Sequence, residues 1–365
     1  MHAGRMPLDV SVARSPISRI TLEPEQTTVS ELSLGIPRAK VIELASGTTV
    51  GPYELLAPLG AGGMSEVWRA RRRRGGAERV VRGVAVKVAR LDCSSDVEGR
   101  RMFHREAEIG ATIHHANVVD VLELGVSGGR PYLVMSLVEG PSLAQLAHRT
   151  PMPWSLTVAV LGDILRGLHA AHEARGENGD PFELVHCDVS PQNVLVGVDG
   201  LARICDFGVA RVGRLPERRT GAIVAGKTSY FAPEQAMGER LDRRVDVFAA
   251  GVVLWELLTG SRLFRSGSRG ETLANVLFAT IRHPTSVRSS VPRALGDVAM
   301  RALARDRSKR FPTARAFGIA LASAARSTGL APSIDDVAAF VETSIAAWRA
   351  GHACASRPPA VSYIG

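Results

Sequence analysis

The sequence predicts an α+β fold of two lobes, in which a small antiparallel sheet with one helix precedes a mostly helical lobe. Three observations predict it. From residue 53 to residue 88, short apolar and β-branched stretches alternate with glycines, which is typical of strands joined by tight turns. A helical period follows around residues 101–114. After Gly140, helical periods dominate residues 142–172, 246–260 and 295–325. We therefore expect a smaller lobe over residues 53–140 and a larger one over residues 141–322.

The bulk composition agrees with one large intracellular domain. A chain of 365 residues with 45% hydrophobic content can bury the core of a two-lobed domain. The four cysteines lack CxxC spacing (Cys93, Cys187, Cys205 and Cys354), so neither a zinc site nor a disulfide framework is predicted. The sequence shows no apolar core of signal-peptide length near its start and no apolar run of about 20 residues. These features predict a cytoplasmic protein without a membrane span.

The positive charge is concentrated in one segment. The net charge is +9, and residues 69–82 contain seven arginines and one glutamate, which supply six of those nine charges. The run Arg71–Arg74 is followed by Gly75 and Gly76, a turn signal that predicts a solvated hairpin. Aromatic residues make up only 5% of the chain and none lies in this stretch. We therefore expect no nucleic-acid partner.

The two ends of the chain differ from its centre. Residues 1–47 mix Pro, Ser, Thr and balanced charges without sustained periodicity, which predicts a flexible N-terminal extension. Near the other end, Ser333 precedes apolar residues at helical spacing (Val337, Phe340, Val341, Ile345 and Trp348). We expect an amphipathic helix over residues 323–350 that packs on the larger lobe, followed by a disordered tail over residues 351–365.

A glycine-rich turn lies between the first two expected strands. Its residues are Leu59, Gly60, Ala61, Gly62, Gly63, Met64, Ser65, Glu66 and Val67. Missing side chains let backbone N–H groups approach a phosphate. A dinucleotide-binding fold would need a third glycine where Ser65 stands and a helix where a strand follows, so that alternative is disfavoured. A flexible hairpin without a ligand remains the other interpretation.

Lys87 lies in an apolar strand over residues 84–88, where an ammonium group needs a fixed anion. Glu106 shares one face of the following helix with apolar residues at helical spacing (Met102, Ile109 and Ile113). An acid on an inward face needs a partner as well. We predict an ion pair between Lys87 and Glu106 that holds the lysine toward α- and β-phosphates. A lysine that extends to the surface is the alternative.

From Tyr53 to Ala322 the chain resembles the eukaryotic-like serine/threonine protein kinases of bacteria. His186-Cys187-Asp188-Val189-Ser190-Pro191-Gln192-Asn193 is similar to the family's HRDxKxxN catalytic loop, and Asp206-Phe207-Gly208 to its DFG motif. The resemblance implies the two-lobed protein-kinase fold, with Asp188 as the base for the substrate hydroxyl and Asn193 and Asp206 as Mg²⁺ ligands. It also implies ATP and Mg²⁺ as cofactors, with Mn²⁺ as a substitute.

The same resemblance implies further roles. Leu59, Val67, Ala85 and Leu195 would enclose adenine, Met135 would be the gatekeeper, and the backbone from Ser136 to Val138 would bind the adenine edge. Glu234, in Tyr230-Phe231-Ala232-Pro233-Glu234, would end the activation loop and pair with Arg310. Asp246 lies inside an apolar helix over residues 245–258 and needs backbone donors. The family uses this acid to anchor the catalytic loop.

Three residues depart from the family pattern. Cys187 replaces the arginine before the catalytic aspartate, so a phosphorylated activation loop would lack its cationic partner, and we predict activity without such phosphorylation. Ser190 replaces the catalytic-loop lysine, and Lys227 stands where the family has a threonine. We predict that Lys227 supplies the lost charge near the γ-phosphate, with Ser190 as its hydrogen-bonding neighbour. A solvent-facing lysine is the alternative.

The predicted function is ATP-dependent phosphoryl transfer to Ser/Thr hydroxyls of proteins. The partners would be protein substrates and an upstream sensor or adaptor protein. A pseudokinase that serves as a binding module is the first alternative, because of Cys187 and Ser190. A small-molecule phosphotransferase is the second, and the expected pairing of Glu234 with Arg310 disfavours it. Cys187 and Cys205 flank the two catalytic acids and could be redox-active, although inert core residues are the favoured interpretation.

Overall fold

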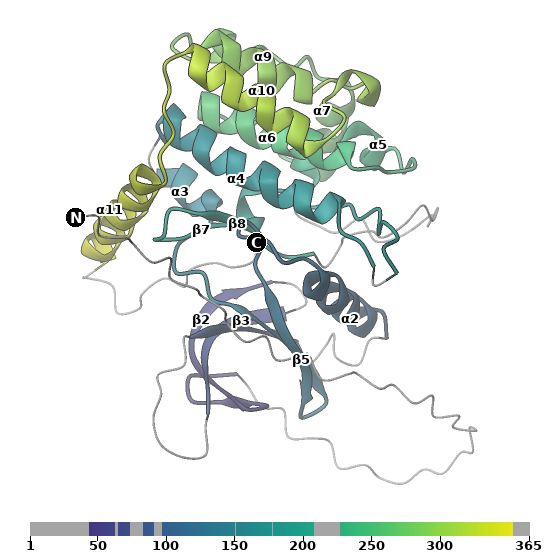
Figure 1. Cartoon of the computed structure of the whole chain (residues 1–365), viewed down its shortest axis with the longest axis vertical. Helices are drawn as coiled ribbons and strands as arrows, with labels where there is room; N and C mark the ends of the chain where they lie inside the picture. The colour runs from purple at the N-terminus through teal and green to yellow at the C-terminus, as the bar shows by residue number, and fades with distance from the viewer. Residues whose placement is uncertain are drawn as a thin grey trace, which may run out of the picture. The chain divides into compact units, whose positions relative to one another are not determined.

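The computed structural model describes residues 44–62, 65–73, 83–90, 97–149, 151–176, 178–207 and 227–352 (Figure 1). Several predictions lie outside these residues. They concern residues 1–43 of the predicted N-terminal extension, the tail after residue 352, and the residues Gly63, Met64 and Gly208.

The smaller lobe is an antiparallel sheet covered by one helix. Its strands are β1 (Thr49–Val50), β2 (Tyr53–Ala61), β3 (Ser65–Arg72), β4 (Val84–Ala89), β5 (Val121–Ser127) and β6 (Arg130–Ser136). They are ordered β1-β2-β3-β4-β6-β5, and each neighbouring pair is antiparallel. Helix α2 (Val97–Thr112) packs against β5 and β6. All six residues of β4 are buried, so this strand is the centre of the lobe. The predicted sheet and single helix are confirmed.

Two boundaries differ from the prediction. The lobe begins before Tyr53, because β1 pairs with β2 through Val50 and Tyr53. A strand of two residues is too short to show a period in the sequence. Helix α2 begins at Val97 rather than near Arg101, and its first turn carries too few apolar residues for periodicity to detect.

The larger lobe is mostly helical. Its helices are α3 (Leu143–Arg149), α4 (Trp154–His172), α5 (Pro233–Ala236), α6 (Arg244–Thr259), α7 (Arg269–Phe278), α8 (Pro284–Val287), α9 (Arg293–Ala302), α10 (Ala314–Ser327) and α11 (Ile334–His352). Three 3-10 turns, η1 (Pro191–Asn193), η2 (Thr228–Tyr230) and η3 (Arg307–Lys309), and a hairpin of β7 (Val194–Val196) and β8 (Ala202–Ile204) complete it. None of the helices in the described ranges is long and apolar enough to cross a bilayer.

Helix α6 forms the centre of this lobe. Every residue of α6 after Arg244 is buried, as expected for a helix that is apolar on all sides. Helices α4, α9 and α10 pack around it, and Figure 1 shows α4, α6 and α10 as neighbouring layers. The β7–β8 hairpin packs on α4. The two segments that carry the predicted catalytic acids therefore rest on the best-buried part of the protein.

The predicted helix over residues 323–350 is wrong in its first part. Helix α10 continues to Ser327, and Gly329 then adopts a left-handed φ of 73°, which ends a helix. Pro332 follows, and α11 begins only at Ile334. Helix α11 packs on α4, with Val337 and Val341 buried in the core of the lobe.

Candidate active site

Lys87 and Glu106 form the predicted ion pair. The Lys87 Nζ lies 2.7 Å from each carboxylate oxygen of Glu106. Strand β4 supplies the lysine and the facing side of α2 supplies the glutamate. Their side chains are 8% and 7% exposed, so each charge depends on the other for neutralisation. The ring of Phe103, on the same helix, lies 5.9 Å from the ammonium.

Asp206 approaches the same lysine from the other lobe. It follows β8, and its Oδ1 accepts a hydrogen bond of 3.2 Å from Lys87 Nζ. Burial works to lower the pKa of Lys87, but the charges of Asp206 and Glu106 outweigh it and hold the pKa above its usual range. Burial would raise the pKa of Asp206, yet Lys87 and Lys227 bring it down to about 2. For Glu106, burial dominates and raises the pKa to about 7.

The predicted catalytic loop places Asp188 and Asn193 together. The Asn193 amide Nδ2 donates to the Asp188 carbonyl oxygen at 2.9 Å and to its Oδ2 at 2.8 Å. The backbone N–H of Asp188 donates to His186 Nδ1 at 3.2 Å. The ring of His186 packs against Phe207, with ring centroids 4.7 Å apart. Through this contact the loop touches the segment that carries Asp206.

Asp246, in helix α6, anchors this loop through its carboxylate. Its carboxylate accepts backbone N–H bonds from His186 at 2.8 Å and from Cys187 at 2.9 Å. Cys187 has a left-handed φ of 65°, a strained conformation found at functional sites. The sequence predicted the backbone donors but missed His172, whose Nε2 lies 2.8 Å from Asp246 Oδ2. The only signal for His172 was its place at the end of an apolar helical period.

Lys227 lies against the catalytic loop, as predicted, but its partners differ from the prediction. Its Nζ donates to Asp188 Oδ2 at 2.8 Å and to Asn193 Oδ1 at 2.7 Å. Burial raises the pKa of Asp188, and the charge of Lys227 works to lower it. The predicted bond to Ser190 is absent. Among the described residues, the buried Ser190 Oγ has no hydrogen-bond partner. A carboxylate and an amide oxygen are stronger acceptors for an ammonium than a hydroxyl.

The residues expected around adenine share one hydrophobic cluster. It contains Leu59, Val67, Ala85, Met135, Val138 and Leu195, together with residues that the sequence did not indicate (Ala89, Phe103, Ala107, Val119, Leu133 and Cys205). Strands β2, β3, β4 and β6 contribute to it from one lobe and β7 from the other. The expected adenine-edge contact from the backbone of Ser136 to Val138 stays a prediction. The N–H of Ser136 donates to the Asp120 carbonyl at 2.9 Å, so only its carbonyl could face a base.

The glycine-rich segment forms the predicted turn between two strands. Gly60 and Ala61 end β2, Ser65 begins β3, and the N–H of Gly62 donates to the Ser65 carbonyl at 2.8 Å. Gly60 faces Val67 across the strand pair, which brings this turn next to the hydrophobic cluster.

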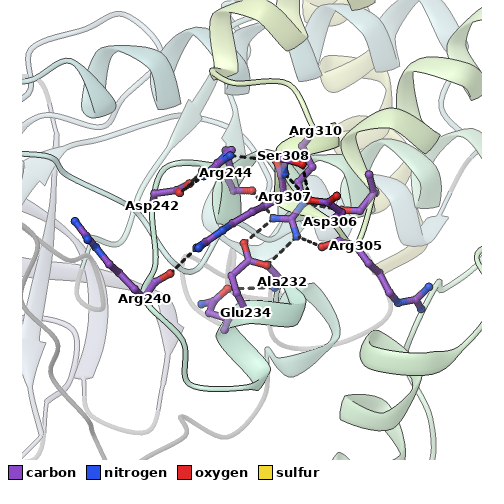
Figure 2. Close-up of polar contacts among 12 residues, drawn as sticks. Ala232, Glu234, Arg240, Asp242, Arg244, Arg305, Asp306, Arg307, Ser308 and Arg310 are labelled. Carbon is purple, nitrogen blue, oxygen red and sulfur yellow. Dashed lines mark hydrogen bonds and ion pairs between the residues drawn. The ribbon is translucent and has the colours of Figure 1, made fainter.

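Glu234 and Arg310 form the predicted structural pair (Figure 2). Arg310 Nη1 lies 2.6 Å from Glu234 Oε1, and Nη2 lies 2.8 Å from Oε2. Arg310 also donates to the backbone oxygens of Ala304, Arg244 and Arg305, and the last two of these residues are labelled in Figure 2. One contact was missed by the sequence: Gln235 Nε2 donates to the Cys187 carbonyl at 2.8 Å, and so links this region to the catalytic loop.

A divalent metal ion fits this site only in part. The described residues contain no group of three or more His, Cys, Asp or Glu side chains that could hold a metal, so phosphate oxygens would have to complete the coordination. Asp206 uses Oδ1 for Lys87 and can present its other oxygen to an ion. Asn193 Oδ1, the second predicted ligand, already lies 2.7 Å from Lys227 Nζ.

Comparison with known proteins identifies relatives among bacterial kinases. The chain is 36% identical over 308 residues to tyrosine-protein kinase MasK of Myxococcus xanthus, a match that covers 82% of this chain and 46% of MasK. It is 34% identical over 272 residues to serine/threonine-protein kinase PknB of Mycobacterium leprae, covering 72% of this chain and 41% of PknB. The chain therefore spans less than half the length of these two relatives.

A crystal structure and a family model give the same result. A double mutant of the Mycobacterium tuberculosis PknI kinase domain has a TM-score of 0.60 and 27% sequence identity, covering 78% of this chain and 100% of that one. The protein kinase domain model matches residues 53–318. This range contains the Lys87–Glu106 pair, both predicted catalytic acids and the Glu234–Arg310 pair. The chain belongs to the protein kinase family.

Proposed function

We propose that this chain transfers the γ-phosphate of ATP to serine or threonine hydroxyls of other proteins. One observation carries the proposal. Lys87, from the smaller lobe, lies 3.2 Å from Asp206 and 2.7 Å from Glu106, although 119 positions separate Lys87 from Asp206 in the chain. Such a convergence of charges at the junction of two lobes suits a triphosphate.

The side chains suggest a division of labour. Bound ATP with a divalent ion would supply the phosphoryl group and much of the charge neutralisation. Lys87, held in place by Glu106, would bind the α- and β-phosphates. Asp188 would accept the proton of the substrate hydroxyl, since burial raises its pKa and so makes it a better base. The hydrophobic cluster around Ala85 and Leu195 would receive the adenine ring.

A protein acceptor is favoured over a small molecule. Glu234 and Arg310 are almost completely buried, and they fix the end of the activation segment in the way that the resemblance to protein kinases implies. The named PknB relative is a serine/threonine kinase, which favours those hydroxyls. Tyrosine is the second candidate acceptor, because MasK, 36% identical to this chain, is named a tyrosine kinase.

The direct test is an assay with labelled ATP, Mg²⁺ and a generic basic protein, followed by phosphoamino-acid analysis. We expect phosphoserine and phosphothreonine from the wild type and no product from Asp188→Asn. Phosphotyrosine alone would select the second candidate acceptor. Nucleotide binding without transfer would instead indicate a pseudokinase.

Lys227 is proposed to replace the charge of the missing catalytic-loop lysine. Its ammonium contacts Asp188 and Asn193 at 2.8 and 2.7 Å, which supports a role beside the transferring phosphoryl group. We expect Lys227→Ala to lower kcat about 100-fold or more, the loss typical for a preorganised donor. The swap Ser190→Lys with Lys227→Thr should restore most of it. A fully active Lys227→Ala would refute this role.

Activity is proposed to be independent of activation-loop phosphorylation. The side chain of Cys187 carries no positive charge to neutralise a phosphate, and the Cys187 carbonyl accepts a bond from Gln235. Among the described residues, Asp246 and Lys227 hold the loop. Protein treated with a phosphatase should phosphorylate an added substrate at nearly the untreated rate. A large decrease in that rate would contradict the proposal.

A further inference from the structure

Asn193 has no freedom to turn its amide group. The side chain is fully buried, and its Nδ2 donates to two oxygens of Asp188 at 2.9 and 2.8 Å. Turning the amide by 180° would place Oδ1 against two acceptors and the NH₂ group against the ammonium of Lys227, so three favourable contacts would become unfavourable. Oδ1 must therefore face Lys227.

Lys227 occupies the side of Asn193 that a metal ion would need. Its Nζ is 2.7 Å from Asn193 Oδ1 and 2.8 Å from Asp188 Oδ2, and its side chain is only 12% exposed. A Mg²⁺ ligand lies about 2.0–2.1 Å from the ion. A divalent ion on the same amide oxygen would thus stand directly beside the ammonium, in a site where little water screens the repulsion.

The neighbouring Ser190 leaves this arrangement undisturbed. Ser190 is fully buried, and among the described residues its Oγ has no hydrogen-bond partner. A lysine at position 190, as in the related kinases, would bring a second ammonium toward Asp188. Within the part of the chain that the structure describes, the cation that contacts Asp188 and Asn193 is therefore the ammonium at position 227.

We propose that the ammonium of Lys227 takes the place of a metal ion at Asn193, so that this kinase binds its nucleotide with one divalent ion, held by Asp206. The inference rests on the proposed function, because it assumes that ATP binds between the two lobes. Asp206 suits the remaining ion, since its contact with Lys87 uses Oδ1 and its second carboxylate oxygen can face the ion.

Counting bound Mn²⁺ tests the inference without any turnover. The full chain is saturated with a non-hydrolysable ATP analogue and titrated with Mn²⁺, and free Mn²⁺ is measured by electron paramagnetic resonance. We expect one bound Mn²⁺ per nucleotide in the wild type and two in Lys227→Thr. The swap Ser190→Lys with Lys227→Thr should also bind two.

A variant of Asn193 identifies where the second ion binds. Asn193→Ala should leave the count at one in the wild-type background and lower it from two to one in Lys227→Thr. Circular dichroism melting checks that each variant is folded. Lys227→Met is a second variant that removes the charge and leaves Asn193 Oδ1 free of the ammonium. Its count should be two.

The outcomes separate the inference from the proposed function. Two Mn²⁺ ions in the wild type, or one ion in both the wild type and the charge-removed variants, would overturn the inference. Neither result would contradict the proposed kinase function. A wild type that binds no Mn²⁺-nucleotide at all would overturn both.

Discussion

Arg310 is expected to contribute strongly to the stability of the larger lobe, because it forms a buried ion pair with Glu234. Its side chain is completely buried and that of Glu234 is 4% exposed, and their two contacts of 2.6 and 2.8 Å form a bidentate pair. Replacing Arg310 by alanine would leave the Glu234 carboxylate buried without a counter-charge. Removing one partner of a buried pair costs about 3–5 kcal/mol.

Other contacts of Arg310 place the expected cost near the upper end of that range. The guanidinium also donates to the carbonyl oxygens of Ala304, Arg244 and Arg305 at 2.7, 3.0 and 3.0 Å. Each carbonyl left without a donor adds to the cost. The side chain also packs over the ring of Phe248 at 4.8 Å, and alanine would leave a cavity there.

Urea unfolding followed by circular dichroism measures this cost. The double substitution of Arg310 and Glu234 by methionine should recover at least half of the lost stability, because it leaves no unpaired charge. Arg293→Ala is the matched control: Arg293 and Asp297 are 81% and 57% exposed and lie 3.9 Å apart, so stability should change by less than about 0.5 kcal/mol. A cost below about 1 kcal/mol for Arg310→Ala would refute the reasoning.

Three further predictions concern helix packing, pH and thiol reactivity. Gly167→Ala should destabilise the protein, because the new Cβ would lie 2.4 Å from the Asn117 carbonyl oxygen. Gly162→Ala, on the same helix, meets no atom closer than 3.6 Å and should stabilise the protein by about 0.5–1 kcal/mol. Thermal melts compare the two variants, and equal shifts in melting temperature would contradict the close packing at Gly167. Burial raises the pKa of Glu106 from 4.5 to about 7, so between these pH values the folded protein binds a proton that the unfolded chain has released. Relative to Glu106→Gln, the wild type should therefore lose unfolding free energy as pH rises through this range; parallel urea-stability profiles for the two proteins would disagree with this sign. Burial raises the pKa of the Cys205 thiol to about 12, so iodoacetamide at pH 8 should leave it unmodified until the protein unfolds, and rapid labelling seen by mass spectrometry would show the opposite.

The paired charges were predictable because charged residues in apolar segments need partners. Helical spacing placed Glu106 on an inward face, and an apolar strand surrounded Lys87, so each residue indicated the other. The same reasoning assigned backbone donors to Asp246. The pairing of Glu234 with Arg310 came from the family resemblance, since spacing alone cannot join residues 76 positions apart.

What the sequence missed depends on geometry between distant segments. Lys227 contacts Asp188 and Asn193 rather than Ser190, and this depends on the relative placement of segments that are 34 to 39 positions apart in the chain. His172 contacts Asp246, which also binds the catalytic loop, although the two residues are 74 positions apart. Helical periodicity predicts that such a residue is buried but does not predict its partner. Short elements such as β1 have no period to detect.

The carboxylate of Asp246 has a consequence for how the protein is made. During synthesis the catalytic loop emerges from the ribosome about 60 residues before Asp246. The Asp246 carboxylate accepts hydrogen bonds from the backbone N–H groups of His186 and Cys187. A nascent chain that ends at Phe207 contains Lys87, Glu106, Asp188, Asn193 and Asp206, yet it lacks the acceptor that turns both amides the same way. The residues proposed to carry out phosphoryl transfer are therefore translated early and acquire their final arrangement only after α6 has emerged.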